Sequence, residues 1–130
     1  DERLVFYSTI AECVAVEKPN VVLLSSVLQY LPDPYAVLDE LFGSGAEIIL
    51  VDRTSFWDGQ EDLLGVQNVT ETIYPASYPF WIFSKKNFIR YLSGKFNLIS
   101  ETLSPEGFVS FAKGRFSFNG FMMKRCFHEK

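Results

Sequence analysis

Two unbroken apolar runs of strand length lie close together in the chain. Val21–Leu24 and Ile48–Val51 show no alternation of apolar and polar side chains, a pattern typical of strands buried on both faces of a parallel sheet. Between them, Asp33 and Pro34 form an N-cap followed by proline at the first helical position. Apolar residues then recur at helical spacing as far as Phe42. A strand, a helix and a second strand in this order predict a βαβ unit.

The segment before this unit predicts a strand and a helix of its own. Leu4–Tyr7 is a short run of β-type residues. Thr9 is followed three residues later by Glu12, which is the spacing of a capping box, so we expect a short helix as far as about Val16. Because the strand-like run begins almost at the first residue, we also expect that a further part of the polypeptide precedes it.

After the βαβ unit, the sequence predicts one more helix and a pair of strands. Ser84 is a helix N-cap, and the helix after it carries an apolar stripe. Phe96–Leu103 and Arg115–Met123 then alternate apolar with polar residues, as half-buried strands do. Gly120 interrupts the second alternation, which indicates a bulge or a close approach of two backbones. Since a loop rich in proline and glycine joins the two strands, we expect an antiparallel pair at the edge of the sheet.

Residues 54–83 break this regular pattern. They contain several glycines and prolines and a concentration of aromatic side chains. An irregular connection of this length inside a compact domain usually has a function. Tyr74 and Tyr78 are each followed by proline and combine a polar tip with a fixed backbone, so we expect them to line a ligand pocket. The alternative is that the aromatic side chains belong to the core, which we expect for Phe80 and Phe83.

The composition fits a single folded domain. The 130 residues are 48% hydrophobic and 22% charged, which excludes a disordered or collagen-like chain. The 12 basic and 16 acidic residues give a net charge of −4, and with no long basic run we expect no nucleic-acid partner. No apolar run reaches the roughly 20 residues of a membrane span, so we expect no membrane partner. Cys13 and Cys126 form no Cys-x-x-Cys pair, and a reducing, cytoplasmic location is the simplest expectation.

Few residues offer catalytic chemistry. The one histidine, His128, lies in the C-terminal tail, and the common nucleophile, zinc and phosphate-binding motifs are missing, so we expect no metal site. The remaining evidence for a site is the position of a few polar residues in the predicted sheet. Ser25–Ser26 and Asp52–Arg53 directly follow the two apolar runs, and ligands of open parallel sheets bind beyond the carboxyl ends of the strands. The serines have an alternative role as caps of the turn at Val27, and Arg53 has one in a structural ion pair with a carboxylate such as Asp52 or Asp39.

Taken in order, these stretches resemble a known pattern. Asn20–Pro34 reads NVVLLSSVLQYLPDP, an apolar strand followed by a small polar residue, a V-L-x-H/Y-L run and an Asp-Pro helix start. It is similar to the fourth-strand motif of class I S-adenosylmethionine-dependent methyltransferases. More narrowly, Leu28–Leu31, Val51–Thr54 and Ile73–Pro79 together resemble a bacterial family of methyltransferases associated with polysaccharide biosynthesis. The resemblance covers nearly the whole chain.

The resemblance implies an α/β fold, namely the C-terminal part of a Rossmann-like methyltransferase sheet with a βαβ unit plus an antiparallel edge pair. Leu4–Tyr7, Val21–Ser25 and Ile48–Asp52 would be its third, fourth and fifth strands. Residues 1–130 would form a single partial methyltransferase domain, with 54–83 as an aromatic loop or lid on the acceptor side. The family's Gly-rich turn and ribose-binding acidic residue, which belong to its N-terminal half, are missing from this sequence. We therefore expect this chain by itself to be an inactive fragment.

The resemblance also assigns roles to individual residues. S-adenosyl-L-methionine would be the cofactor, and a sugar or another small molecule would be the methyl acceptor. The residues implied for the cofactor side are Ser8, Thr9, Ile10, Ser26, Val27 and Tyr30. Those implied for the acceptor side are Arg53, Thr54, Tyr78 and Trp81. Asp52 and Tyr74 are the candidates for a general base, which is needed only for a poorly acidic hydroxyl or a protonated amine.

One edge of the sheet should be exposed in such a fragment. In the family's strand order, strand four pairs with strand one, so Val21–Leu24 would be left as an apolar edge and an aggregation hazard. We predict that Leu4–Tyr7 docks on this edge, or that the same strand of a second chain covers it in a homodimer.

Two other functions stay open. The first is a non-catalytic α/β module that binds a partner or a small ligand through its aromatic segment. The second is another nucleotide- or sugar-using transferase with a similar half-sheet. The missing Gly-rich turn favours the module for this chain alone, whereas the order of the motifs favours the methyltransferase.

Overall fold

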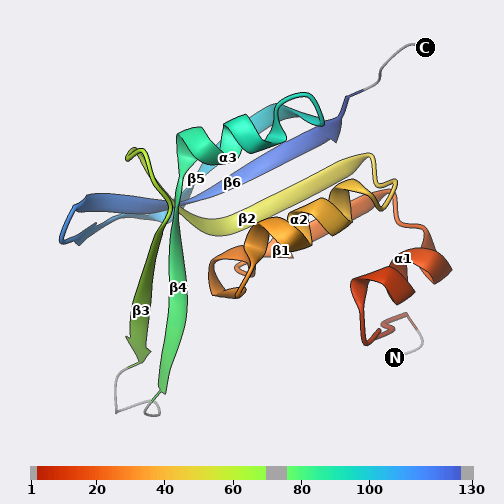
Figure 1. Cartoon of the computed structure of the whole chain (residues 1–130), viewed down its shortest axis with the longest axis horizontal. Coiled ribbons are helices and arrows are strands. Elements are labelled where there is room, and N and C mark those ends of the chain that lie inside the picture. Colours follow the sequence, from red (N-terminus) through yellow and green to blue (C-terminus); the bar gives the residue numbers. More distant parts are fainter. Residues whose placement is uncertain (1–2, 70–75, 127–130) are drawn as a thin grey trace.

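The computed structural model describes residues 3–69 and 76–126, which form an α/β fold with three helices and a mixed six-stranded sheet (Figure 1). The helices are α1 (Ile10–Glu17), α2 (Pro34–Phe42) and α3 (Lys85–Leu92), with a 3-10 helix η1 (Leu28–Tyr30). The strands are β1 (Val21–Ser25), β2 (Ile48–Trp57), β3 (Leu63–Val69), β4 (Ala76–Ser84), β5 (Phe96–Phe111) and β6 (Gly114–Arg125).

The βαβ unit predicted from the sequence is confirmed. β1 and β2 pair in parallel, with Val21 beside Ile48 and Ser25 beside Asp52, and α2 connects them. On its other side β2 pairs antiparallel with β6, and β6 pairs antiparallel with β5. The predicted antiparallel pair at the edge is therefore also confirmed. β4 pairs in parallel with the last two residues of β2, on the same side as β1 but further along the strand.

Side-chain caps begin all three helices. The side-chain oxygens of Thr9, Asp33 and Ser84 each accept the backbone N–H three residues further on, at 3.1, 3.2 and 3.3 Å. A cap of this kind typically contributes about 1 kcal/mol to stability. Each of the three is the residue that the sequence predicted, so the helix starts follow from local sequence alone.

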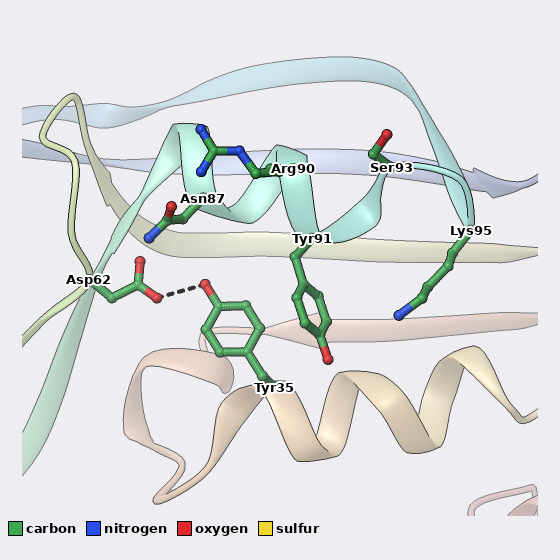
Figure 2. Close-up of a pocket in the computed structure, with 7 residues that line it drawn as sticks. All are labelled: Tyr35, Asp62, Asn87, Arg90, Tyr91, Ser93 and Lys95. Atoms are coloured by element: carbon green, nitrogen blue, oxygen red, sulfur yellow. Dashed lines mark hydrogen bonds between the residues drawn. The ribbon is translucent and has the colours of Figure 1, made fainter.

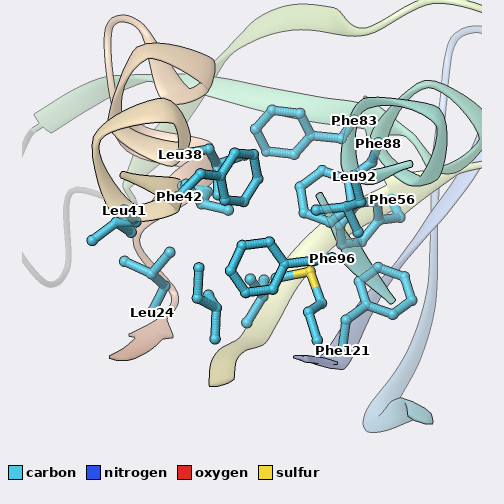
Figure 3. Packing of buried hydrophobic residues seen from close by; sticks show 14 residues of the cluster. Leu24, Leu38, Leu41, Phe42, Phe56, Phe83, Phe88, Leu92, Phe96 and Phe121 are labelled. Carbon is cyan, nitrogen blue, oxygen red and sulfur yellow. The ribbon is translucent and has the colours of Figure 1, made fainter. Parts of the chain in front are cut away.

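One hydrophobic cluster joins α2, α3 and a single face of the sheet (Figure 3). Its buried members are Leu24, Leu28, Leu38, Leu41, Phe42, Ile49, Val51, Phe56, Phe83, Phe88, Leu92, Phe96, Phe121 and Met123. The Phe56 ring of β2 lies at its centre, 4.9 Å from the Phe121 ring and 5.0 Å from the Phe88 ring between centroids. Burying one such side chain contributes roughly 1.5–3 kcal/mol, so this cluster holds α3 against the sheet.

The prediction that residues 54–83 are irregular is wrong in the part that the structure describes. β2 continues to Trp57, and β3 and β4 form an antiparallel hairpin in which Leu63 pairs with Ile82. Proline is normally absent from the interior of a strand. At Pro79, however, β4 pairs only with β3 and has no partner strand on its other side. Its missing N–H therefore removes no bond on the opposite side of the strand.

The prediction of a strand at Leu4–Tyr7 is also wrong. These residues form no strand and their apolar side chains are largely exposed, while the Tyr7 hydroxyl donates to Glu17 of α1. A short run becomes a strand only where a neighbour accepts its backbone hydrogen bonds, and this segment does not reach β1. The outer edge of β1 stays open, with Val21 50% and Leu23 62% exposed, so the predicted docking does not occur. Cover by a second chain stays a prediction.

The loop predicted between the two late strands is much shorter than expected. β5 runs to Phe111 and β6 begins at Gly114. A register shift between Leu103 and Phe108 accommodates Pro105 inside β5. Edge strands tolerate proline and bulges because one side of their backbone pairs with no other strand.

Candidate functional site

The carboxyl ends of β1 and β2 lie side by side. The Ser25 hydroxyl donates to Asp52 Oδ2 at 3.3 Å, and the two residues are partners in the parallel register. Ser26 follows with a φ of 54°, and its amide donates to Asp52 O at 2.9 Å. The structure thus brings the two polar strand ends together, at the place where open α/β sheets bind ligands.

A β-bulge in β2 shapes this cluster. The register between β2 and β6 shifts between Val51 and Thr54, so Asp52 and Arg53 together face Gly120. Arg53 has a φ of 50°, in the left-handed region that few residues other than glycine adopt. Gly120 leaves room for the bulge, because a Cβ there would lie only 3.3 Å from Val51 O and 3.4 Å from Asp52 Oδ1. The interruption predicted at Gly120 is therefore a close approach of two backbones.

The two residues after Asp52 have structural contacts. Arg53 is exposed and forms an ion pair, as the alternative role predicted, but its partner is Glu106 of β5 and not Asp52 or Asp39. An exposed pair contributes about 0–1 kcal/mol, so a ligand can displace it at little cost. Thr54 is fully buried and its hydroxyl donates to Asp52 O at 3.1 Å. Thr54 thus supports the bulge and has no exposed surface for the substrate contact that the resemblance implied.

A buried amide that sequence reasoning missed links the two strand ends. Gln29 in η1 is fully buried, and its Nε2 donates to Arg53 O at 2.9 Å and to Ser26 Oγ at 3.3 Å. Its Oε1 has no hydrogen-bond partner among the described residues. The sequence contained a signal for this role, since Gln29 is a polar residue inside the apolar run 27–31. A polar side chain that is buried with such a run needs hydrogen-bond partners.

Two of the predicted tyrosines meet beside this cluster. The ring of Tyr30, at the end of η1, packs edge-to-face on Tyr78 of β4 with 6.4 Å between centroids, and lies 5.7 Å from the Phe80 ring. Both tyrosines are partly exposed, so a ligand can reach them. Trp81 is half-buried and its indole N–H donates to Leu31 O at 3.0 Å. Its polar group is therefore used to join the β3–β4 hairpin to η1.

The remaining predicted residues that the structure describes make no side-chain hydrogen bond or ring contact with this cluster. Ser8–Ile10 lie at the start of α1, where Thr9 is the helix cap and Ile10 packs against the main core. No hydrogen bond among the described residues connects this segment to the ends of β1 and β2. Val27 is exposed beside the end of β1. Tyr74 lies outside the described residues.

A cavity of about 260 Å³ opens beside Asp52. Its lining residues are Leu23, Leu50, Val51, Asp52, Ser100, Thr102, Gly120, Phe121 and Met122. Leu23, Leu50 and Met122 alternate along their strands with core residues, so they belong to the sheet face that points away from α2 and α3. The volume is below the range of drug-sized ligands, which suits a small molecule or one ring of a larger one. Within residues 3–69 and 76–126, no group of three or more potential metal ligands is present.

Comparisons with known proteins add no assignment to this site. No known family model matches the chain, and no significant match was found among curated proteins or solved structures. In the part of the chain that the structure describes, no helix combines the length and the apolar character needed to cross a bilayer. A function must therefore be argued from the residues and their geometry.

Proposed function

We propose that the chain is the C-terminal part of an S-adenosyl-L-methionine-dependent methyltransferase that acts on a sugar or another small acceptor. The observation that carries the proposal is the joined cluster of polar strand ends, Ser25–Ser26 and Asp52–Arg53. The strand order supports it as well. β1 and β2 lie in parallel and are followed by the reversed β6–β5 pair, which is the order that the resemblance implies for strands four, five and the late pair.

The described residues suit one part of the cofactor. Ser26 and Val27 present exposed positions at the end of β1, and Tyr30 adds a partly exposed ring that suits the adenosyl part. The Gly-rich turn and the ribose-binding carboxylate of the family have no counterpart in this sequence. When bound, the cofactor supplies an electrophilic methyl group on a sulfonium.

Asp52 is the residue best placed to act on the acceptor. Its carboxylate lines the cavity at the strand ends, and the Ser25 hydroxyl orients it by donating to Oδ2. An acceptor hydroxyl in the cavity would transfer its proton to Asp52. Leu23 and Leu50 give the cavity apolar walls against which the acceptor's ring would pack. Arg53 would bind a polar group of the acceptor in place of Glu106.

Calorimetric titration with S-adenosylhomocysteine tests the cofactor. We expect binding by a longer native polypeptide that contains this sequence, and no binding by the present chain, because the latter provides only part of the site. Binding by neither polypeptide would overturn the methyltransferase proposal.

Asp52→Asn in the longer polypeptide tests the mechanism. We expect it to retain the dissociation constant for S-adenosylhomocysteine and to lower methyl transfer to a hydroxyl acceptor, found in a panel of hexoses and nucleotide sugars, by roughly 100-fold or more. Asp58→Asn, at an exposed carboxylate just after β2, is the matched control and should change neither quantity. Full activity of the Asp52 variant would remove Asp52 from the mechanism.

The open edge of β1 supports a second candidate, a non-catalytic module that pairs with another copy of this chain. Val21 and Leu23 are exposed on β1, and no described strand pairs with its outer edge. Two such edges can pair antiparallel around a two-fold axis. Sedimentation velocity should show a dimer that Leu23→Lys abolishes and that Ile99→Lys, an exposed apolar position on β5, leaves intact. A wild-type chain that is monomeric at every concentration would contradict this candidate.

A further inference from the structure

A second cavity lies away from the strand ends, between α2 and α3 (Figure 2). It has a volume of about 610 Å³ and is lined by Tyr35, Asp62, Asn87, Arg90, Tyr91, Ser93 and Lys95. None of these residues lines the cavity beside Asp52. Whatever this cavity binds therefore does not depend on the proposed methyltransferase site.

The carboxylates around this cavity already have donors. The Tyr35 hydroxyl donates to Asp62 Oδ2 at 2.7 Å, and Asp62 Oδ1 accepts the backbone N–H of Ser84 at 2.7 Å. The Tyr91 hydroxyl donates to Asp39 of α2. Burial and the hydrogen bond to Asp62 raise the pKa of Tyr35, and the hydrogen bond to Asp39 raises the pKa of Tyr91 to about 12. Both hydroxyls therefore stay protonated near neutral pH and continue to donate hydrogen bonds to the two carboxylates.

The polar groups that remain are mainly donors. Arg90 is exposed, and its guanidinium has no hydrogen bond or ion pair among the described residues. In Figure 2 it extends along α3 on the side of Asn87, whose side-chain amide also has no partner in the part of the chain that is described. Lys95 Nζ lies 4.9 Å from the centroid of the Tyr91 ring, a weak contact that the flexible side chain can leave. Lys95 Nζ also lies 5.5 Å from the centroid of the Phe42 ring. The unpartnered guanidinium and side-chain amide, together with this second cation, are complementary to an anion.

The apolar part of the cavity is a pair of aromatic rings. The ring centroids of Tyr35 and Tyr91 lie 4.6 Å apart, with an angle of 59° between the ring planes. Both side chains are half-buried and both line the cavity, so each presents part of its surface to it. Such surfaces pack well on a flat organic ring. The lining carries two cations, Arg90 and Lys95, against one carboxylate, Asp62, whereas the whole chain carries a net charge of −4.

From these contacts we infer that the cavity between α2 and α3 binds a small phosphate monoester, with its phosphate on Arg90 and Asn87 and its organic ring against Tyr35 and Tyr91. Arg90 is the principal residue because a guanidinium can bind two phosphate oxygens at once. Lys95 adds a second positive charge at the other end of the cavity. A carboxylate ligand would fit less well, since it offers fewer acceptor oxygens to these donors.

Phenyl phosphate is the probe that tests this site. Titration of the chain, followed by two-dimensional ¹H–¹⁵N NMR, should give saturable shifts of the backbone amides between Asn87 and Lys95. Arg90→Gln should weaken binding by about tenfold or more, because a hydrogen bond to a charged group is lost. Lys86→Gln removes the same charge from an exposed position on α3 outside the cavity, so its affinity should equal that of the wild type.

Two related compounds separate the parts of the ligand. Inorganic phosphate should bind at the same amides more weakly than phenyl phosphate, and phenol should not saturate. Tyr91→Leu should weaken the binding of phenyl phosphate and leave that of inorganic phosphate unchanged. Absence of saturable shifts with phenyl phosphate would overturn the proposal, as would equal losses in the Arg90 and Lys86 variants, which would reveal only general charge attraction.

Discussion

Replacing Gln29 with glutamate tests whether the buried amide holds the ends of β1 and β2 together. The substitution keeps the side-chain size and turns the amide into an acid. A neutral carboxylic acid retains one O–H donor, which can serve Arg53 O. A charged carboxylate has no donor and would place a negative oxygen against that carbonyl, in a position without solvent exposure. The folded protein should therefore keep this group protonated.

The size of the effect follows from the cost of keeping that proton. A glutamate in the unfolded chain has a pKa of about 4.3, and each pH unit above it corresponds to about 1.4 kcal/mol. The free energy of unfolding should thus fall by up to about 4 kcal/mol at pH 7.5 and about 1.6 kcal/mol at pH 5.5. The folded state holds a proton that the unfolded state releases, so stability decreases as the pH rises. Losing the bond to Ser26 Oγ adds about 1 kcal/mol at both pH values.

Urea unfolding, followed by tryptophan fluorescence at pH 5.5 and 7.5, measures this difference. Gln29→Met is the matched control, because it removes both N–H donors and also the unpaired Oε1. Losing the donors lowers the free energy of unfolding and losing the unpaired oxygen raises it, by about 1–3 kcal/mol each. The free energy of unfolding of the methionine variant should therefore be close to that of the wild type at either pH. A glutamate penalty of equal size at both pH values, or none at pH 7.5, would refute the placement of Gln29 against Arg53.

Two further predictions concern the bulge and a tyrosine. Gly120→Ala should lower the free energy of unfolding by about 1–3 kcal/mol, because its Cβ would lie 2.7 Å from Thr102 Oγ1 and 3.3 Å from Val51 O. Gly65→Ala, whose Cβ meets only an ordinary contact, should change it little; equal values from thermal unfolding would contradict the bulge geometry. The hydrogen bond to Asp39 raises the pKa of Tyr91 to about 12, so Asp39→Asn should lower this pKa toward 10.0. An ultraviolet titration curve that is identical in the two proteins would contradict that hydrogen bond.

The amino-acid sequence by itself determined the elements whose signals lie within a few residues. The three helix caps, Thr9, Asp33 and Ser84, were readable because a cap is a bond between a side chain and an amide three residues away. The unbroken apolar runs predicted β1 and the first half of β2, which pair in parallel. The burial on both faces that the same runs predicted is wrong for β1, because Val21 and Leu23 stay exposed at an edge that no described strand covers. The polar residues that end these strands were readable as a candidate site from their position alone.

Only the tertiary structure decided which segments became strands and which polar groups met. Leu4–Tyr7 has the composition of a strand but no neighbour to bond with, whereas β3 and β4 pair despite Gly65 and Pro79 because each strand supplies the other's partners. The contacts of Gln29 with Arg53 and of Arg53 with Glu106 join residues that are 24 and 53 positions apart in the sequence. Hydrogen bonds and cavities of this kind depend on distances in space, and a local pattern of residue types contains no information about those distances.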